Sequence, residues 1–294
     1  MTDTYRGIRS AQIGLLVNAV LAATKLVAGM VGNSYALVAD AIESTADIIG
    51  SLVVWSGLAV AAQPADANHP FGHGKAEAIA AAVVAFMLIG AALGIGYESL
   101  HGIRTPHEVP APWTLIVLVV VVAVKTVMSR WVRHVGGSIG STAVEADAWH
   151  HLSDAVTSGA AFVGIAIAVY GQRVFGGTGW AAADDWAALL ASGIILFNGV
   201  TLLGPAMNDL MDRMPGDNIV GPVRAAAESV PGVLAVEKLW VLKTGLFYVA
   251  TAHVQAAPDM PLAQAHELGH RVQDAIREAV PSVHLVTVHM EPYE

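Results

Sequence analysis

The sequence predicts six membrane-spanning helices followed by a small cytosolic α+β domain, and three observations support this fold class. Only 13% of the 294 residues are charged and the mean hydropathy is +0.57, whereas a soluble protein carries about 25% charged residues. Six apolar segments each approach the roughly 20 residues that cross a bilayer. After Asp212-Arg213-Met214-Pro215-Gly216 the pattern becomes that of a soluble domain. We therefore expect a membrane domain at 1–208 and a cytosolic domain at 209–294.

The six apolar segments differ in the charges that they carry. The fourth contains the apolar run Leu115 to Val124, and the third and sixth have no charge over their central spans. The second and fifth are the least hydrophobic because they carry acidic motifs. Lys25 and Lys125 are the other charges inside the spans, and we interpret them as snorkelling or ion-pairing residues. The expected spans are 11–31, 35–62, 77–99, 112–131, 143–170 and 184–206.

Basic residues near the ends of these segments predict the orientation of the chain. With the N-terminus inside, only Arg104 and Arg173 fall on the outer side. The inner side then holds Arg6, Arg9, Lys75, Arg130, Arg133 and Arg213. Both termini are therefore expected in the cytoplasm. The stretch Thr2 to Ser10 is polar and precedes no cleavage signal, so we expect the first apolar segment to be retained.

Charge and cysteine content exclude several kinds of partner. The net charge of −9 argues against a nucleic-acid partner. The chain has no cysteine, so it forms no disulfide and offers no thiolate to a soft Cu(I) site. The 12 histidines are many for a chain with 15 Lys plus Arg, and they cluster. Metal ions are therefore the ligands to look for.

The C-terminal region predicts two helices and three strands in the order αββαβ. A short helix at 218–230 ends at Pro231-Gly232, and a last strand covers 283–290. Between them, 233–242 and 246–256 form a hairpin, and 261–280 has apolar positions at helical spacing. This order predicts a two-layer domain of the ferredoxin-like type.

The strongest functional signal is a motif that occurs twice inside the predicted membrane. Residues 39–47 and 146–154 both begin with Ala-Asp-Ala, and steps of three and four place their metal-competent side chains on one helix face. Charged residues at this depth need a partner, a cavity or an ion. Facing each other, the two motifs offer a four-ligand cage for a divalent cation. Its ligands would be Glu43, Asp47, His150 and Asp154.

The same acidic residues allow a second interpretation. They could form a polar contact between helices, with carboxylates paired to Lys25 or Lys125. Asp40 and Asp147 lie one turn before the expected ligands. They could support those ligands by hydrogen bonding or belong to a water path.

Two further clusters lie outside the predicted spans. In the loop between the second and third segments, Asp66, His69 and His73 could bind a second cation, or could simply form a polar turn. The C-terminal domain holds His253, His266, His270, His284 and His289, with Glu237 and Glu291 nearby. His284 could be no more than a solvent-facing strand residue.

One C-terminal segment also matches a zinc-peptidase pattern. His266-Glu267-Leu268-Gly269-His270 has the His-Glu-x-x-His spacing. A zinc peptidase needs a substrate cleft and a third ligand, and only 24 residues follow His270. We therefore keep a membrane-anchored peptidase only as a minor alternative.

Taken together, these motifs resemble the cation diffusion facilitators of the bacterial ferrous-iron and zinc efflux type. The resemblance covers essentially the whole chain. It rests on Ala36–Ser44 with Asp47, on Gln63–Glu77, on Ala146–Asp154 and on the αββαβ tail. It implies a homodimeric secondary transporter, not an enzyme, in the bacterial inner membrane, exchanging a divalent metal for protons.

The resemblance also implies roles for particular residues. Glu43, Asp47, His150 and Asp154 would form the transport site, and Asp66, His69 and His73 the loop site. The tail is similar to a metallochaperone-like domain that dimerises and binds regulatory metal. Its candidate ligands are His253, His266, His289 and Glu291, with Glu237 where some members have a histidine. Lys75 and Asp212 would form the contact that holds family dimers together.

One position departs from the family pattern and bears on the choice of metal. Members usually have His or Asp at position 43, and this chain has Glu. His150 favours Zn(II), Fe(II), Co(II) or Cd(II) over Mn(II). We expect export of Zn(II) or Fe(II), and a metal-gated channel or sensor remains the alternative from another class.

Overall fold

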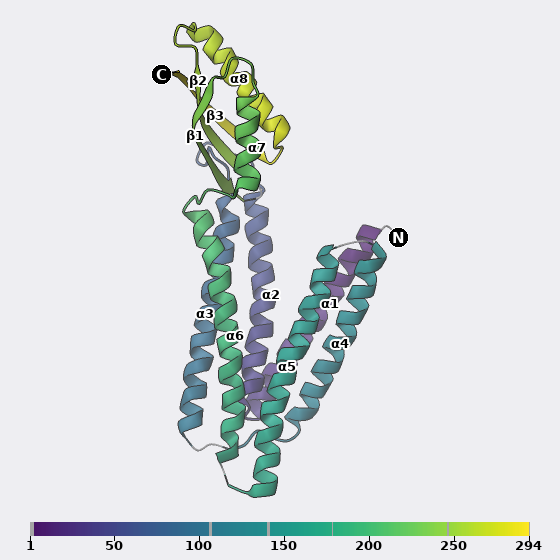
Figure 1. Cartoon of the computed structure of the whole chain (residues 1–294). Coiled ribbons are helices and arrows are strands. Elements are labelled where there is room, and N and C mark those ends of the chain that lie inside the picture. Colours follow the sequence, from purple (N-terminus) through teal and green to yellow (C-terminus); the bar gives the residue numbers. More distant parts are fainter. Residues whose placement is uncertain (1–2, 106–107, 140–141, 178, 246, 294) are drawn as a thin grey trace. The chain divides into compact units, whose positions relative to one another are not determined.

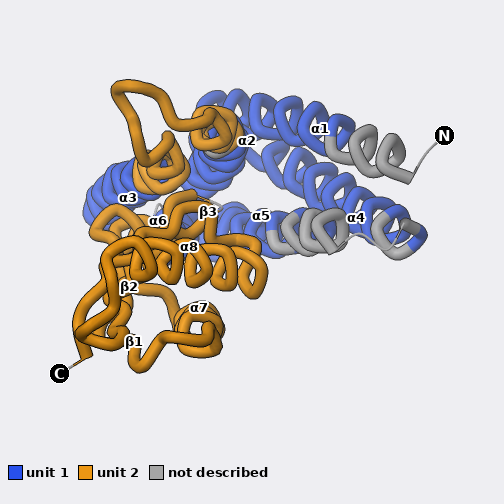
Figure 2. The backbone as a smooth tube through the Cα atoms, turned by 90° about the horizontal axis from the view of Figure 1, so that it is seen from above, with its two compact units in different colours: residues 1–52, 84–201 blue, residues 53–83, 202–294 orange. Residues whose placement is uncertain are grey.

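The computed structural model describes residues 3–105, 108–139, 142–177, 179–245 and 247–293. Within these ranges the side chains at 3–11, 54, 136–137, 139, 142–147, 149–150 and 153 are not described. The chain divides into two compact units, one of residues 1–52 and 84–201 and the other of residues 53–83 and 202–294 (Figure 2). Each unit is described by itself.

Six long helices are apolar enough to cross a membrane within the described part of the chain, which confirms the six predicted spans (Figure 1). They are α1 (Asp3–Val31), α2 (Tyr35–Ala61), α3 (Lys75–Arg104), α4 (Thr114–Ile139), α5 (Thr142–Phe175) and α6 (Ala182–Leu210). A short 3₁₀ turn, Gly179–Ala181, precedes α6. Several helices run beyond the expected spans because hydropathy marks the part within the bilayer and a helix continues into polar residues. The domain boundary expected at 208 lies close to the end of α6.

The first unit packs its helices through small residues. Its main core contains residues from all six long helices, and alanine is the commonest among them. A Cβ on Gly164 of α5 would lie 2.4 Å from Ala187 Cβ of α6, so glycine lets these two helices approach closely. Similarly, Gly32 allows the end of α1 to reach α4, because a Cβ there would lie 2.2 Å from Thr114 Cγ2. A second core cluster joins α1, α4 and α5 around Met128 and Val132.

The second unit contains the C-terminal domain in the predicted αββαβ order. Its elements are α7 (Asp217–Glu228), β1 (Ala235–Thr244), β2 (Phe247–Ala256), α8 (Leu262–Ala279) and β3 (Val283–Pro292). The sheet order is β1-β2-β3, with β1 antiparallel and β3 parallel to β2. Apolar residues of α7 and α8 pack with those of the sheet in one core, which gives the two layers (Figure 1). The fold class is therefore confirmed.

Two details of the second unit position the metal-competent residues. The register of β1 against β2 shifts between Val236 and Lys238, so Glu237 sits at a β-bulge, an irregularity that re-aims side chains. Gly74, directly before α3, lies against the β1–β2 turn, and a Cβ on Gly74 would come within 2.5 Å of the Thr244 carbonyl oxygen. Only glycine fits this contact between the loop and the sheet.

Candidate metal centres

The repeated motif on α2 places a buried carboxylate between three helices. Asp40 is 3% exposed, and its Oδ1 lies 3.0 Å from the Nζ of Lys25 on α1. Its Oδ2 accepts a hydrogen bond of 2.8 Å from Ser158 Oγ on α5. Asp40 therefore ties the first motif to the neighbouring helices α1 and α5.

The motif on α5 also carries an ion pair. Asp154 is 8% exposed and pairs with the Nζ of Lys125 on α4. The same ammonium donates to Asn18 Oδ1 on α1 at 2.8 Å. Lys25 and Lys125 are 0% and 1% exposed, so both are ion-pairing residues rather than snorkelling ones.

Glu43 lies beside a cavity inside the first unit. The cavity measures about 90 Å³ and is lined by Asp40 and Glu43 of α2 together with residues of α5 and α6. Asp47, Asp40 and Asp154 are each near enough to Glu43 to interact with it electrostatically. Three of the four expected transport ligands, Glu43, Asp47 and Asp154, therefore share one neighbourhood.

The remaining motif residues cannot be placed in the same way. The backbone of α5 carries His150 and Asp147, but both side chains lie outside the described residues. The complete four-ligand cage stays a prediction. What the described side chains establish is that buried Asp40 and half-buried Glu43 line a small cavity between apolar helices.

One buried acid near this site escaped the sequence analysis. Asp184 at the start of α6 is fully buried and accepts hydrogen bonds from Ser34 Oγ (2.7 Å) and the backbone N–H of Tyr35 (2.6 Å). It also accepts from the N–H of Ala36 at 3.3 Å, so it caps the N-terminus of α2 from another helix. The available signal was the pair Asp184-Asp185 at the head of an apolar span.

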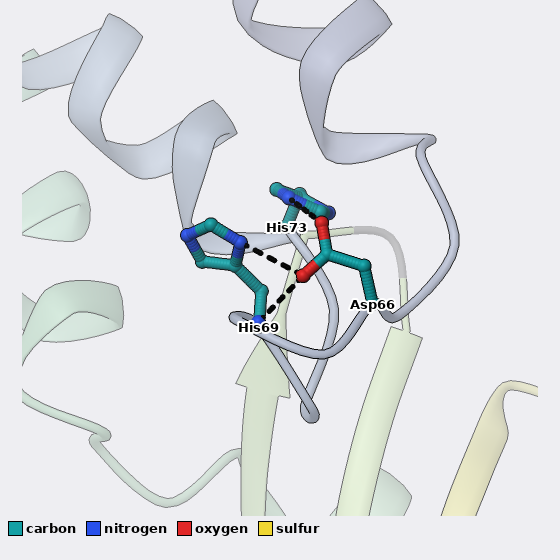
Figure 3. A group of neighbouring side chains, drawn as sticks. All are labelled: Asp66, His69 and His73. Atoms are coloured by element: carbon teal, nitrogen blue, oxygen red, sulfur yellow. Dashed lines mark hydrogen bonds and ion pairs between the residues drawn. The ribbon is translucent and has the colours of Figure 1, made fainter.

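The loop cluster forms a group of three potential metal ligands outside the spans (Figure 3). His69 Nδ1 and His73 Nε2 lie 3.2 Å and 3.4 Å from the two carboxylate oxygens of Asp66. The two imidazole rings are 4.3 Å apart between centroids. All three side chains therefore converge, and their ligand atoms lie within 4.8 Å of one another. This spacing suits one divalent cation.

Hydrogen bonds prepare Asp66 to act as an anion. Its Oδ1 accepts the backbone N–H groups of His69 (2.7 Å) and Asn68 (2.8 Å). These bonds, that from His69 first, lower the pKa of Asp66 below its ordinary value. The residue is therefore ionised at neutral pH, as a metal ligand must be.

The C-terminal domain holds a second group of three. His253 and His289 pair in register on the parallel strands β2 and β3, and Glu291 follows on β3. His253 Nδ1 lies 2.7 Å from Glu291 Oε1, and His289 Nε2 lies 3.5 Å from the same oxygen. Hydrogen bonds with Glu237 and with His253 lower the pKa of Glu291. The bulged residue Glu237 thus belongs to this group.

The other histidines of the domain lie apart from it. His266 and His270 face each other on α8 with their Nε2 atoms 3.1 Å apart, and neither belongs to a metal-competent group of three among the described residues. In the described structure the peptidase-like motif thus forms a histidine pair with no third ligand close by. His284 is exposed and stacks on Phe247.

Two lysine–aspartate contacts join parts of the second unit. Lys75 Nζ lies 2.9 Å from Asp212 Oδ1, so the pair implied by the resemblance forms within one chain. Lys243 on β1 donates to Asp209 Oδ2 at 2.7 Å, and this hydrogen bond raises the pKa of Lys243. Both contacts link residues at or just after the end of α6 to other parts of the unit.

These features define a multi-pass membrane protein with acidic side chains in its membrane-spanning helices and, among the described residues, two metal-competent groups of three in its loop and its tail. Comparison with known families agrees. Residues 11–211 match the cation efflux transmembrane domain, and residues 215–293 match the cytoplasmic domain of cation efflux proteins. The chain belongs to the cation efflux, or cation diffusion facilitator, family.

Individual relatives align over nearly the whole chain. The manganese efflux system protein MneP of Bacillus subtilis is 28% identical over 286 residues, covering 96% of this chain and 95% of that protein. The magnetosome protein MamM of Magnetospirillum gryphiswaldense is 32% identical, with coverage of 96% and 87%. The cation-efflux pump FieF of Cronobacter sakazakii is 31% identical, with coverage of 97% and 92%.

Among solved structures, the nickel form of the E289H variant of the MamM C-terminal domain is 26% identical to this chain. It covers 27% of this chain and 100% of its own, with a TM-score of 0.27.

Proposed function

We propose that this protein is a homodimeric secondary transporter that exports a divalent metal cation from the bacterial cytoplasm in exchange for protons. One observation carries the proposal: Asp40 and Glu43 line a cavity between apolar membrane helices, and Asp154 lies near enough to interact with Glu43 electrostatically. Acidic groups at such depth are costly unless they pair with a charge or bind an ion or a proton. A site of this kind suits a cation that crosses the membrane.

The proposed transport ligands are Glu43, Asp47, His150 and Asp154. Metal binding requires three ionised carboxylates and a neutral imidazole, because these ligands coordinate in their deprotonated forms. Protons that enter from the outer side would neutralise the same groups and release the metal. His150 is the natural titrating member since an unperturbed imidazole has a pKa of about 6.5. Competition for one set of ligands thus couples the two fluxes.

The two exposed clusters would act on the cytosolic side. Asp66, His69 and His73 offer a preformed group of three, which we assign to a second cation at the loop. His253, His289 and Glu291, with Glu237, would bind metal in the tail and bias the dimer toward its competent state through differential affinity. His266 remains a further tail ligand, now paired with His270.

Ligand chemistry guides the choice of metal. A site with one imidazole and three carboxylates suits Zn(II) and Fe(II), followed by Co(II) and Cd(II), whereas an oxygen-only site suits Mn(II). The relatives do not share one metal in their names, because MneP is described as a manganese efflux protein and FieF only as a cation-efflux pump. We therefore place Zn(II) and Fe(II) first and keep Mn(II) in the test.

The proposal places both termini in the cytoplasm and the protein in the inner membrane. The distribution of basic residues supports this orientation. The motif residues Asp40 and Glu43 then lie toward the outer half of α2, and the loop cluster lies at its inner end. Metal would reach the loop before it reaches the membrane site.

Flux measurements in proteoliposomes under an imposed pH gradient test the proposal. Zn(II), Fe(II), Co(II), Cd(II) and Mn(II) would be compared for the wild type, Asp154→Ala and the exposed-site control Asp274→Asn. We expect gradient-driven flux in the wild type and the control, and flux at background level in Asp154→Ala. Wild-type flux that ignores the gradient would favour a metal-gated channel. Absence of metal flux, together with a peptidase activity that is lost in Glu267→Gln, would favour the peptidase.

A further inference from the structure

The two buried lysines of the first unit have different environments although each pairs with one motif carboxylate. An ammonium group has three N–H donors. Lys25 Nζ has three partners: Asp40 Oδ1 at 3.0 Å, the Asp40 carbonyl oxygen at 3.1 Å and Ser44 Oγ at 2.6 Å. Ser158 binds the other carboxylate oxygen of Asp40. The ammonium of Lys25 and both carboxylate oxygens of Asp40 therefore all have partners within the protein. Asp40, the carboxylate that pairs with Lys25, is not one of the proposed transport ligands.

Lys125 instead pairs with a carboxylate that the transported metal would need. Its Nζ contacts Asp154 Oδ2 and donates to Asn18 Oδ1 at 2.8 Å. Asp154 is a proposed transport ligand, whereas Asn18 is a neutral amide on α1. The ammonium therefore has one partner that the metal competes for and one that it keeps.

We propose that Lys125 is a resident counter-ion that holds Asp154 while the site is empty and that the metal displaces, with Asn18 retaining the ammonium. The inference rests on the proposed transport function. A buried carboxylate without a partner is strongly unfavourable, so the ion pair stabilises the metal-free state. Metal binding must replace that pair, and the nearby ammonium repels the bound cation. Both effects lower affinity and favour release.

This role makes Lys125 a positioning residue whose charge sets the balance between binding and turnover. Removing the charge takes away one competitor for Asp154 and the repulsion of the cation, so affinity should rise and release should slow. Removing Asn18 has the opposite effect, because the ammonium then keeps Asp154 as its remaining partner among those described here. A merely structural lysine would not produce opposite changes in affinity from two variants of one contact.

The experiment uses the full-length protein in detergent and in proteoliposomes, with Zn(II) as the probe. We measure Zn(II) affinity by competition with a chromophoric chelator, and the maximal rate and KM of Zn(II) flux. For Lys125→Met we expect Kd to fall by about tenfold or more, the scale of losing a nearby charge in a poorly screened site, with a lower maximal rate. Lys125→Arg should keep a Kd near the wild-type value. Asn18→Leu should raise Kd.

The controls separate the inference from the proposed function. Lys25→Met should lower thermal stability, and any fall in its Kd should be smaller than in Lys125→Met, because Lys25 pairs with Asp40 and not with a proposed ligand. If Lys125→Met fails to fold, Asn18→Leu still tests the idea, because it removes no charge. An unchanged or higher Kd in folded Lys125→Met, or an unchanged or lower Kd in Asn18→Leu, overturns the inference. If the wild type neither binds nor transports Zn(II) or another of the five metals, the proposed function itself fails.

Discussion

The acidic residues of the membrane-spanning helices and those of the exposed clusters have the same chemistry but opposite environments. Asp40 and Asp154 are buried and each is paired with a buried lysine. Asp66 and Glu291 are at least partly open to solvent and are held ionised by hydrogen bonds. Inside the membrane helices the compensating charge is therefore part of the fold, whereas at the surface water and local hydrogen bonds suffice. Substitutions should accordingly affect stability in proportion to burial.

The largest loss of stability is expected for Lys25→Met, which leaves the buried Asp40 carboxylate without its ammonium. Breaking a buried pair by removing one partner costs about 3–5 kcal/mol. Thermal unfolding of the purified protein in detergent measures the effect, with the exposed Lys75→Met as the matched control. If Lys75→Met loses as much stability as Lys25→Met, burial does not determine how much an ion pair contributes to stability.

A smaller loss is expected for Asp184→Ala, which removes the cap of α2. Loss of a helix cap costs about 0.5–2 kcal/mol. Removing this carboxylate also leaves the Ser34 hydroxyl without its acceptor. The same unfolding measurement applies, and Asp217→Ala at the exposed start of α7 is the control. Equal melting temperatures for the wild type and Asp184→Ala would remove the capping role.

Asp66→Asn should change metal binding at the loop far more than it changes stability. The amide oxygen can still accept the N–H groups of Asn68 and His69, but the charge that attracts a cation is lost. We expect the affinity of the loop site for metal to fall by about tenfold or more, since even loss of a residue that only supports a metal ligand typically has an effect of that size. Calorimetric titration with Zn(II) would show the loss of affinity. A melting temperature that falls as far as in Lys25→Met would contradict the expected difference between buried and exposed acidic residues.

The smallest effect on stability, and a pH-dependent one, is expected for Glu291→Gln. The pKa of Glu291 is lowered in the folded protein, so its carboxylate contributes stability above its ordinary pKa of about 4.3. That contribution is lost as the pH falls through the lowered value. The difference in melting temperature between wild type and variant should therefore be greatest near neutral pH and shrink as the pH falls below the ordinary pKa of a glutamate. If the difference in melting temperature stays constant with pH, the ionisation of Glu291 does not contribute to stability.

Local features of this protein were predictable from the sequence, and contacts between distant segments were not. Asp66, His69 and His73 lie close together in the chain, so their spacing predicted the cluster that the structure shows. The six spans and the αββαβ order followed from hydropathy and periodicity.

The partners of the two buried lysines illustrate what the sequence lacked. Lys25 precedes Asp40 by 15 residues and Lys125 precedes Asp154 by 29, so each pairing depends on how two helices are rotated against each other. Asp184 reaches Tyr35 across 149 positions, and no local pattern encodes that contact. The bulge at Glu237 likewise depends on the pairing between β1 and β2.

The capping contact of Asp184 anchors the N-terminal end of α2, so a tilt of this helix would turn about that end. Its oxygens hold the first backbone N–H groups of the helix, so Tyr35 can rotate about this point but cannot slide along the axis. At a rise of 1.5 Å per residue, Glu43 lies about 12 Å from this pivot and Ala61 about 39 Å. A tilt about the pivot therefore displaces Ala61 about three times as far as Glu43. A larger movement at the Ala61 end of α2 is therefore compatible with a small movement of the proposed ligands on this helix.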